Sequence, residues 1–366
     1  MGAYPEFFPN EISRGNPFRK QVALTFDGGA NRSYTPAIVD ILARLEAKAT
    51  FFVTGGFMKT YPAHTALMAD RGYEIGNHSM THPWLALANS WETAPEMTQE
   101  RFYSELDEAD GLFKSITGRS FDPLWRAPYG ARSLELLRWG AERNLRHVYW
   151  TYDTLDWRTN VSDPLSKSGT SIIQDLMTYH EQAPHGLNGA IILLHLGAQR
   201  AEDPLYPHLT EFVTRLRQDG YSFVNVSDLL GEESRLYESG DVPPACACSA
   251  SVAETFEPSG WSEGVWSDGW LAPRFSLRLT PVRGSTKLVV KLFVPDVVGK
   301  QSVSIMIDGN CVAQAELLPG SQHSLECVAP SRQFALDLFF SHFTCPAIMG
   351  TGEDRRYLAA LLMGIS

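Results

Sequence analysis

The first two thirds of the chain alternate between short apolar runs and longer segments in which apolar residues recur at helical spacing. The apolar runs have the length of buried strands, and the longer segments have the length of amphipathic helices. The predicted strands are Gln21–Phe26, Ala49–Val53, Glu74–Asn77, Leu124–Arg126, Arg146–Thr151, Ala190–His195 and Phe223–Val226. The predicted helices include Thr35–Ala47, Gln99–Thr117, Ser133–Arg143 and Pro207–Asp219. Because repeated β-α units place parallel strands inside and helices outside, we predict an α/β barrel of about seven units.

A different period begins near residue 259. Residues 231–258 contain Glu, Ser, Gly and Pro with little periodicity, which is typical of a linker. Beyond them the chain alternates as strands do, over Arg274–Thr280, Thr286–Pro295, Gln301–Asp308, Cys311–Leu317, Ser321–Val328 and Gln333–Ser341. Asp308-Gly309-Asn310, between two of these runs, is a hairpin signal. We therefore predict a barrel domain over residues 1–230, a linker over 231–258 and an all-β sandwich domain over 259–366.

Composition narrows the classes of partner and compartment. The formal net charge is −11 without a compensating Lys/Arg cluster, which argues against a nucleic-acid partner bound through its phosphates. The longest apolar stretches, such as Ala190–Leu194 and Tyr357–Met363, are far shorter than a membrane span, so we predict no membrane insertion. Met1–Asn10 lacks the pattern of a signal peptide, and the five cysteines are absent from the first 245 residues. Both features favour a reducing, cytoplasmic location, whereas nothing in the sequence predicts the oligomeric state.

Five short motifs follow predicted strands in one order along the first part of the chain. They are Thr25-Phe26-Asp27-Gly28-Gly29, His78-Ser79-Met80-Thr81-His82, Arg126-Ala127-Pro128-Tyr129, Asp153-Thr154-Leu155-Asp156-Trp157 and Leu193-Leu194-His195. In a barrel of parallel strands the chemistry gathers at the C-terminal ends of the strands. The ordered set of a carboxylate, a pair of histidines, an arginine and a lone histidine therefore predicts one hydrolytic site.

The residue types suit the hydrolysis of an amide or ester by a metal-activated water. His78 and His82 stand four residues apart, so on a helical turn both rings would point the same way and could share an ion. Asp27 ends a strand, and the two glycines after it allow substrate or metal to approach the backbone closely. Asp27 is therefore a natural general base for the activated water. Taken singly, Asp27 could equally be a turn residue and the histidines surface or capping residues.

The remaining motif residues supply an acid and its supports. His195 ends an apolar strand and could protonate the leaving amine or alkoxide, with Asp153 holding its imidazole in one tautomer. Arg126 could hold Asp27 through a bidentate ion pair and keep its carboxylate ionised. Alone, His195 could be a buried core histidine, and Arg126 or Asp153 a structural ion-pair partner. The occurrence of all of them in order favours the catalytic interpretation.

The five motifs resemble those of the NodB-homology polysaccharide deacetylases, carbohydrate esterase family 4, over about residues 20–230. The resemblance implies a distorted (β/α) barrel that removes acetyl groups from N-acetylated sugars, or O-acetyl groups from xylan. Matched by position, Asp27 takes the role of base, and His78 and His82 take the roles of metal ligands. Arg126 matches the arginine that orients the base, and His195 matches the general acid.

The resemblance also assigns residues around the substrate. Asp153 matches the aspartate that tunes the catalytic histidine. Tyr129 matches a residue whose backbone N–H helps to form the oxyanion hole. Trp157 and Leu193 match walls of the acetyl pocket. The substrate implied is a carbohydrate.

One position departs from the family pattern. Gly28 stands where the family usually has a metal-binding aspartate, so a divalent ion, expected to be zinc, would be bound more weakly by His78 and His82. Asp27, a water or Asn31 could complete such a site. Two other functions stay open: a cyclic-amide or ureide amidohydrolase with the same type of barrel, and a carbohydrate-binding protein that has lost catalysis. The retained base, acid and supports argue against the second.

Overall fold

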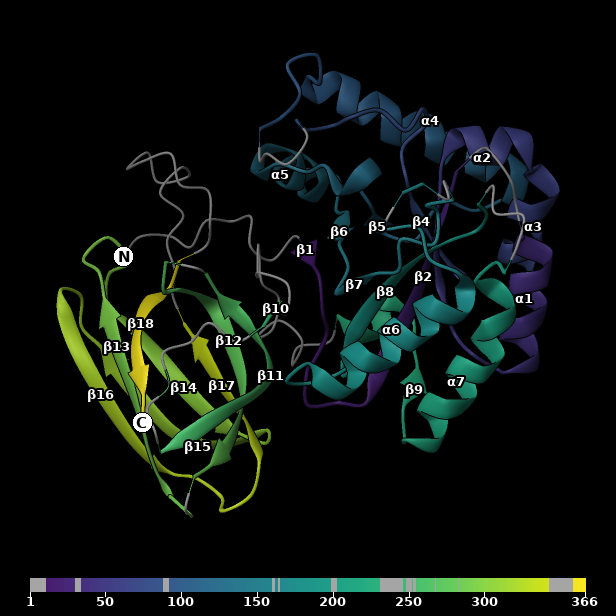
Figure 1. Cartoon of the computed structure of the whole chain (residues 1–366). Coiled ribbons are helices and arrows are strands. Elements are labelled where there is room, and N and C mark those ends of the chain that lie inside the picture. The colour runs from purple at the N-terminus through teal and green to yellow at the C-terminus, as the bar shows by residue number, and fades with distance from the viewer. Residues whose placement is uncertain are drawn as a thin grey trace. The chain divides into compact units, whose positions relative to one another are not determined.

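The computed structural model forms two compact units (Figure 1), Met1–Met177 with Asn188–Glu238, and Thr178–Leu187 with Ser239–Ser366. The residues that it describes are 11–29, 34–87, 92–159, 162–163, 165–198, 203–230, 246–247, 252, 255–266, 268–282, 284–341 and 358–366. Most of the predicted linker, and Asn31, lie outside these residues. Among the described residues, no helix is both long and apolar enough to cross a membrane.

The first unit is built on a parallel sheet of nine strands. In chain order the strands are β1 (Glu11–Ile12), β2 (Gln21–Gly28), β3 (Thr50–Val53), β4 (Glu74–Asn77), β5 (Leu124–Trp125), β6 (Arg146–Val148), β7 (Tyr152–Asp153), β8 (Ala190–His195) and β9 (Ser222–Phe223). Their order in the sheet is β1-β6-β5-β4-β3-β2-β8-β7, and β9 pairs with β2. Every strand-to-strand pairing is parallel, which confirms the predicted α/β fold class.

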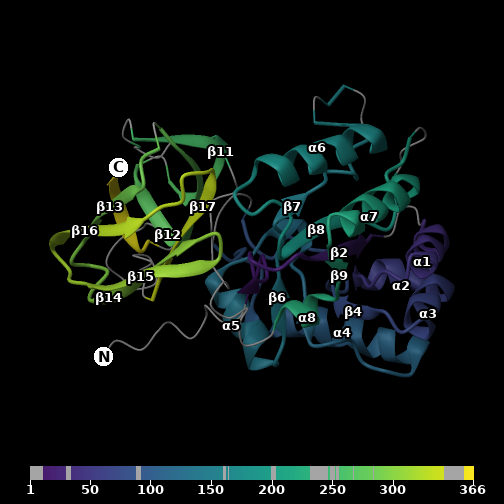
Figure 2. The same cartoon turned by 90° about the horizontal axis from the view of Figure 1, so that it is seen from below.

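Helices lie between most of the strands of the first unit in the sequence, and the short helix α8 follows the last strand (Figure 2). They are α1 (Thr35–Arg44), α2 (Gly55–Thr60), α3 (Pro62–Asp70), α4 (Gln99–Thr117), α5 (Leu134–Glu142), α6 (Gly169–Gln182), α7 (Leu209–Gln218) and α8 (Val226–Leu229), with 3-10 turns η2 (Pro128–Gly130) and η3 (Tyr206–His208). The long helix α4 begins where Thr98 accepts a hydrogen bond from Arg101 N, and ends at Gly118 with a left-handed φ of 78°. This is the usual pairing of a Thr N-cap with a Gly C-terminus.

The predicted strand Phe223–Val226 is wrong in its second half. The strand β9 ends at Phe223, and Val226 begins the short helix α8. Asn225 and Asp228 form a capping box, in which the side chain of each residue accepts a hydrogen bond from the backbone N–H of the other. A capping box satisfies backbone donors that a strand would have to pair elsewhere, so the local polar residues overrode the β-rich composition.

A buried ionic cluster attaches the first strand to the sheet. Glu11 on β1 is paired with Arg132 at 2.5 Å and with the Nδ1 of His147 at 2.7 Å. The other ring nitrogen of His147 accepts a hydrogen bond from the backbone N–H of Ala127 at 3.1 Å. Burial alone would raise the pKa of Glu11, but Arg132 and His147 together lower it to about 2. The cluster therefore joins β1 and β6 to the Arg126-Ala127-Pro128-Tyr129 motif.

The second unit consists of β-strands together with the last residues of α6. Its strands are β10 (Cys246–Ala247), β11 (Phe256–Val265), β12 (Trp270–Pro281), β13 (Lys287–Val294), β14 (Gln301–Ile307), β15 (Asn310–Leu317), β16 (Ser321–Val328), β17 (Phe334–Phe340) and β18 (Ala360–Ile365). They form one antiparallel sheet with the path β15-β14-β17-β12-β18-β13-β16, and the two end strands contact each other, so the sheet curls around its core. Alternate residues of β13 are buried, as the predicted period requires. The predicted hairpin at Asp308-Gly309 is present, with positive φ at both residues.

The Glu11 cluster makes stability depend on acid pH. Because the pKa of Glu11 is lower in the folded state, its contribution is complete above about pH 4.5 and is lost as the pH falls toward 2. We expect Glu11→Gln to lower the free energy of unfolding at pH 7 by roughly 3 kcal/mol, because Arg132 loses its buried partner. Denaturant unfolding at several pH values measures this, with the exposed Glu108→Gln as control. A Glu11→Gln protein as stable as the wild type at pH 7 would contradict the interpretation.

Candidate active site

The strand ends bring the base and acid residues together. Asp27 at the end of β2 lies directly opposite His195 at the end of β8 in the parallel register. His78 follows the last residue of β4, and Arg126 follows the last residue of β5. Since the carboxyl ends of parallel strands meet at one edge of a sheet, these four side chains share one location, as predicted.

Asp27 is a buried carboxylate with two close neighbours. Its Oδ1 accepts a hydrogen bond from Arg126 Nη1 at 2.8 Å, and its Oδ2 lies 3.5 Å from His78 Nε2. Burial by itself would raise the pKa of Asp27, but the charge of Arg126, followed by the influence of His78 and His195, lowers it below its usual range. The side chain is therefore an ionised base at neutral pH.

Arg126 holds Asp27 by one nitrogen, and the predicted bidentate pair is wrong. The fully buried guanidinium donates through Nη1 to Asp27, through Nε to the carbonyl of Val148 at 3.0 Å and through Nη2 to the carbonyl of Tyr149 at 3.3 Å. It also lies 4.3 Å above the ring of Phe52. Because the carbonyls of Val148 and Tyr149 at the end of β6 take two of its three nitrogens, only one remains for the carboxylate.

His78 and His82 converge, although they do not lie on the helical turn that their spacing suggested. The segment is a loop in which Ser79 and His82 have left-handed φ values of 67° and 59°. The backbone N–H of Ser79 donates to the side chain of Asn77. The two imidazole rings still lie 4.9 Å apart at 77°. A bent loop, held by local side-chain bonds, thus replaces the helix.

Glu105 on α4 anchors the same loop and was missed by sequence reasoning. Its carboxylate accepts hydrogen bonds from the backbone N–H of Met80 at 2.9 Å, the N–H of Thr81 at 2.8 Å and the hydroxyl of Thr81 at 2.6 Å. The side chain is nearly buried. Asn77 donates to the carbonyl of Leu106 on the same helix. A charged residue on a helix gives no sequence signal for such a contact, because its partners lie 24 and 25 positions earlier in the chain.

The donors of the two histidines are suited to a divalent cation. His78 Nδ1 lies 2.9 Å from the carbonyl of Arg126 and must carry the proton, which leaves Nε2 directed at Asp27. Burial lowers the pKa of His78, and burial together with His78 lowers the pKa of His82 to about 3, so both rings are neutral. Neutral imidazoles fixed by a backbone carbonyl are typical metal ligands. Within the described ranges, however, no three His, Cys, Asp or Glu side chains form a group that could hold a metal ion.

Gly28 sits in apolar surroundings. A Cβ at this position would come within 3.1–3.2 Å of carbons of Val53, Leu196 and Phe57. Those side chains would have to move by a few tenths of an ångström to accept the aspartate that is usual in the family. The position that lacks the family's carboxylate ligand is therefore closely packed by apolar side chains.

His195 is paired with Asp156, which corrects the role given to Asp153. His195 Nδ1 lies 2.7 Å from Asp156 Oδ1, and its backbone N–H donates to Asp156 Oδ2 at 3.1 Å. Burial would lower the pKa of His195, but the charge and hydrogen bond of Asp156, followed by the charges of Asp27 and Asp153, raise it above its usual value. Asp153 instead accepts a hydrogen bond from the N–H of Leu155 at 2.9 Å. The left-handed φ of 52° at Leu155 turns the chain, so the later aspartate faces β8.

The three residues predicted around the substrate differ in exposure. Leu193 is buried within β8, and its carbonyl accepts hydrogen bonds from Thr154. Trp157 is 47% exposed, with the guanidinium of Arg158 4.9 Å from its ring centre. Tyr129 is 54% exposed and has a left-handed φ of 59°. Tyr129 and Trp157 are therefore accessible, whereas Leu193 belongs to the core.

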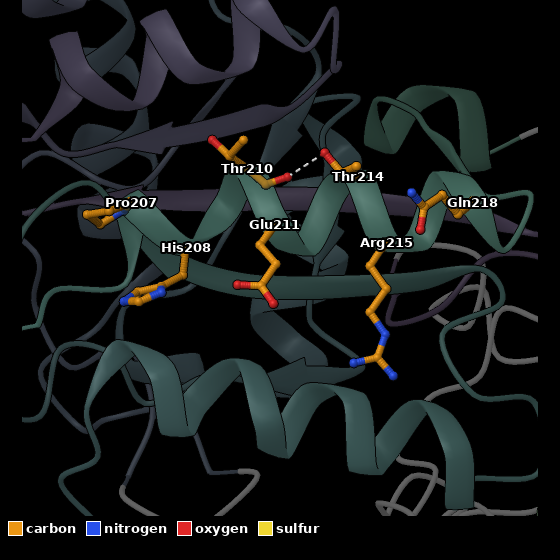
Figure 3. Close-up of a pocket in the computed structure, with 7 residues that line it drawn as sticks. All are labelled: Pro207, His208, Thr210, Glu211, Thr214, Arg215 and Gln218. Carbon is orange, nitrogen blue, oxygen red and sulfur yellow. Dashed lines mark hydrogen bonds between the residues drawn. The ribbon is translucent and has the colours of Figure 1, made fainter.

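A surface hollow of the first unit is separate from these residues. Figure 3 shows it along α7, where the side chains of Glu211 and Arg215 project from the same side of the helix. It is lined by Pro207, His208, Thr210, Glu211, Thr214, Arg215 and Gln218, none of which belongs to the five motifs. A small hollow of about 20 Å³, with room for about one water, does adjoin His195 and Asp156.

Known proteins resemble this chain in sequence and in fold. Residues 14–154 match the family model for polysaccharide deacetylase. The peptidoglycan-N-acetylmuramic acid deacetylase PdaA of Bacillus subtilis is 31% identical over 219 residues, which make up 60% of this chain and 74% of PdaA. The structure of PdaA, described as a family 4 carbohydrate esterase, gives a TM-score of 0.50 at 30% identity and covers 61% of this chain and 85% of that one. A family 4 pseudoenzyme from Bacillus anthracis gives a TM-score of 0.51 at 25% identity, over 61% of this chain and 70% of that one.

These matches confirm the resemblance that the five motifs carried. The family model covers the strands from β2 to β7 with Asp27, His78 and Arg126, whereas β8 with His195 lies beyond its last matched residue. The fold, the motifs and the relatives agree, and the chain therefore belongs to the polysaccharide deacetylase family, carbohydrate esterase family 4.

Proposed function

We propose that this enzyme removes acetyl groups from the N-acetylated sugars of a peptidoglycan-type glycan. Family membership supports the reaction, and relatives named as peptidoglycan deacetylases in Bacillus subtilis and Bacillus cereus support the substrate class. The observation that carries the proposal is the pairing of Asp27 with His195 across neighbouring strands, which puts an ionised base beside an imidazole of raised pKa. The cyclic-amide hydrolase and the inactive binding protein are not favoured by these relatives.

The residues divide the reaction into two proton transfers. Asp27 accepts a proton from the water that attacks the acetyl carbonyl carbon, and Arg126 keeps the carboxylate ionised and oriented. The new C–O bond forms as the carbonyl becomes an oxyanion, for which the backbone N–H of Tyr129 is the proposed donor. His195, protonated and held by Asp156, then donates its proton to the nitrogen as the C–N bond breaks. The products are acetate and a free amine.

A divalent cation would be held in this scheme by the imidazoles of His78 and His82, and Asp27 would have to move to become the third ligand, because the described residues form no group of three. Family 4 deacetylases generally depend on a metal, and neutral imidazoles favour zinc over magnesium or calcium. When bound, such a cation acts as a Lewis acid on the acetyl carbonyl and lowers the pKa of water. With Gly28 in place of a carboxylate, we expect its affinity to be low.

The first prediction from the proposed function concerns the base, Asp27, and the acid, His195. Asp27→Asn and His195→Ala should each lower the rate of acetate release by about 10²-fold or more, because each removes a proton-transfer group. Acetate is measured on N-acetylated and O-acetylated glycans, with circular dichroism to show that the fold is kept. Near-normal release by Asp27→Asn would exclude this mechanism. Release from neither glycan by the wild type would exclude the proposed function.

The second prediction distinguishes the two aspartates of the fourth motif. If Asp156 positions His195, Asp156→Asn should reduce turnover more than Asp153→Asn does. It should also shift the alkaline limb of the pH-rate profile to lower pH, because the raised pKa of His195 depends on that partner and the acid is lost as the pH rises through it. A larger effect of Asp153→Asn on both readouts would return the role to Asp153.

The third prediction concerns the metal. We expect zinc to bind in a one-to-one ratio when it is supplied in excess, to be removed easily by chelators, and to bind at least about tenfold more weakly to His82→Ala. Elemental analysis and a competition titration with a chromophoric chelator measure this without reference to activity, and His64→Ala serves as control. Zinc binding that is equal in the wild type and in His82→Ala would refute the site.

A further inference from the structure

Two exposed aromatic side chains stack on each other beside the site. Trp84 is 47% exposed and Tyr129 is 54% exposed. Their ring centres lie 4.1 Å apart at an angle of 11°, which is a stacked pair. Large aromatic side chains are seldom left this exposed in a pair, because burial of each would contribute roughly 2–3 kcal/mol. The arrangement therefore calls for an explanation.

The stacked pair is continuous with the histidines of the site. The ring of Tyr129 meets the ring of His82 edge-on at 4.5 Å, and His82 meets His78 at 4.9 Å. His78 in turn lies 3.5 Å from the carboxylate of Asp27. A row of rings thus leads from the buried base to the exposed indole of Trp84, in steps of less than 5 Å.

The backbone holds both rings in place. Tyr129 keeps a left-handed φ of 59°, which is unfavourable for an aromatic residue and persists only where the surroundings impose it. Leu85 and Ala86, which follow Trp84, are buried in the core with Phe102 and Trp125. Rigid support of this kind prepares a surface for a ligand, because little side-chain freedom is lost on binding.

We infer that Trp84, stacked on Tyr129, is a platform for the sugar ring next to the one that loses its acetyl group. This inference rests on the proposed function, since it assumes that an N-acetyl group reaches Asp27. A sugar chain placed in that way extends from His82 toward the surface, and the flat face of an indole matches the apolar face of a pyranose ring. Trp84 lies outside the five motifs, so sequence reasoning did not select it.

The test compares long and short substrates with the full chain. The hexamer of N-acetylglucosamine and the single sugar, which has no neighbouring ring, are assayed for acetate release by the wild type, Trp84→Ala, Trp84→Phe and the control Met363→Ala. Met363 lies on β18 and is 48% exposed. We expect Trp84→Ala to lower the ratio of kcat/KM for the hexamer to that for the single sugar about fivefold to tenfold, through KM, which is the scale of one aromatic stacking contact. Trp84→Phe should keep part of the preference, and Met363→Ala should keep all of it.

A binding measurement separates this inference from the proposed function. The hexamer is titrated against the same proteins in the presence of a chelator, and the quenching of tryptophan fluorescence and the heat of binding are followed. The platform is supported if the hexamer binds more weakly to Trp84→Ala than to the wild type and to Met363→Ala. This result would hold even if no acetate is released and the proposed function fails. Equal binding and an equal substrate ratio in the wild type and Trp84→Ala overturn it. Equal losses on the hexamer and the single sugar with a lower Tm also overturn it, because Trp84 would then be structural.

Discussion

The buried guanidinium of Arg126 is the interaction on which the geometry of the site depends. A cation removed from water is tolerated only where oxygen atoms meet its donors. Here each of the three nitrogens has such a partner: Asp27 on β2 and the carbonyls of Val148 and Tyr149 at the end of β6. The carbonyl of Arg126 also fixes the ring of His78. One side chain and its own backbone therefore set the positions of the base, of one imidazole and of the strand ends between them.

The sequence predicted the parts of the site that depend on strand ends. An apolar run followed by a polar residue marks the place where a parallel strand leaves the core, and Asp27, Arg126 and His195 all follow that rule. The alternating burial of β13 was equally predictable, since it depends only on the period of the chain. Local sequence is sufficient where the structure is set by regular geometry.

The errors arose where irregular loops or distant contacts decide. Asp156 rather than Asp153 faces His195 because of a single left-handed residue, Leu155, which the sequence does not announce. Glu105 bonds to a loop 24 residues away. The domain boundary has the same difficulty, because residues 178–187 group with the second unit although the chain returns to the first at 188. A chain that ended near residue 230 would keep residues 178–187 but lack the rest of the second unit, with which they group. The domain boundaries predicted from the sequence stay predictions.

Gly28 changes the balance of charge around the base. A carboxylate at this position would place a second negative charge next to Asp27, and like charges in a buried site raise the pKa of one another. With glycine there, the anion of Asp27 is opposed chiefly by the cation of Arg126, with further contributions from His78 and His195, and its pKa stays low through residues of the chain alone. Residues of the chain therefore keep the carboxylate of Asp27 charged without a metal ion. The protonation state of Asp27 and the binding of a metal ion to His78 and His82 are thus separable properties.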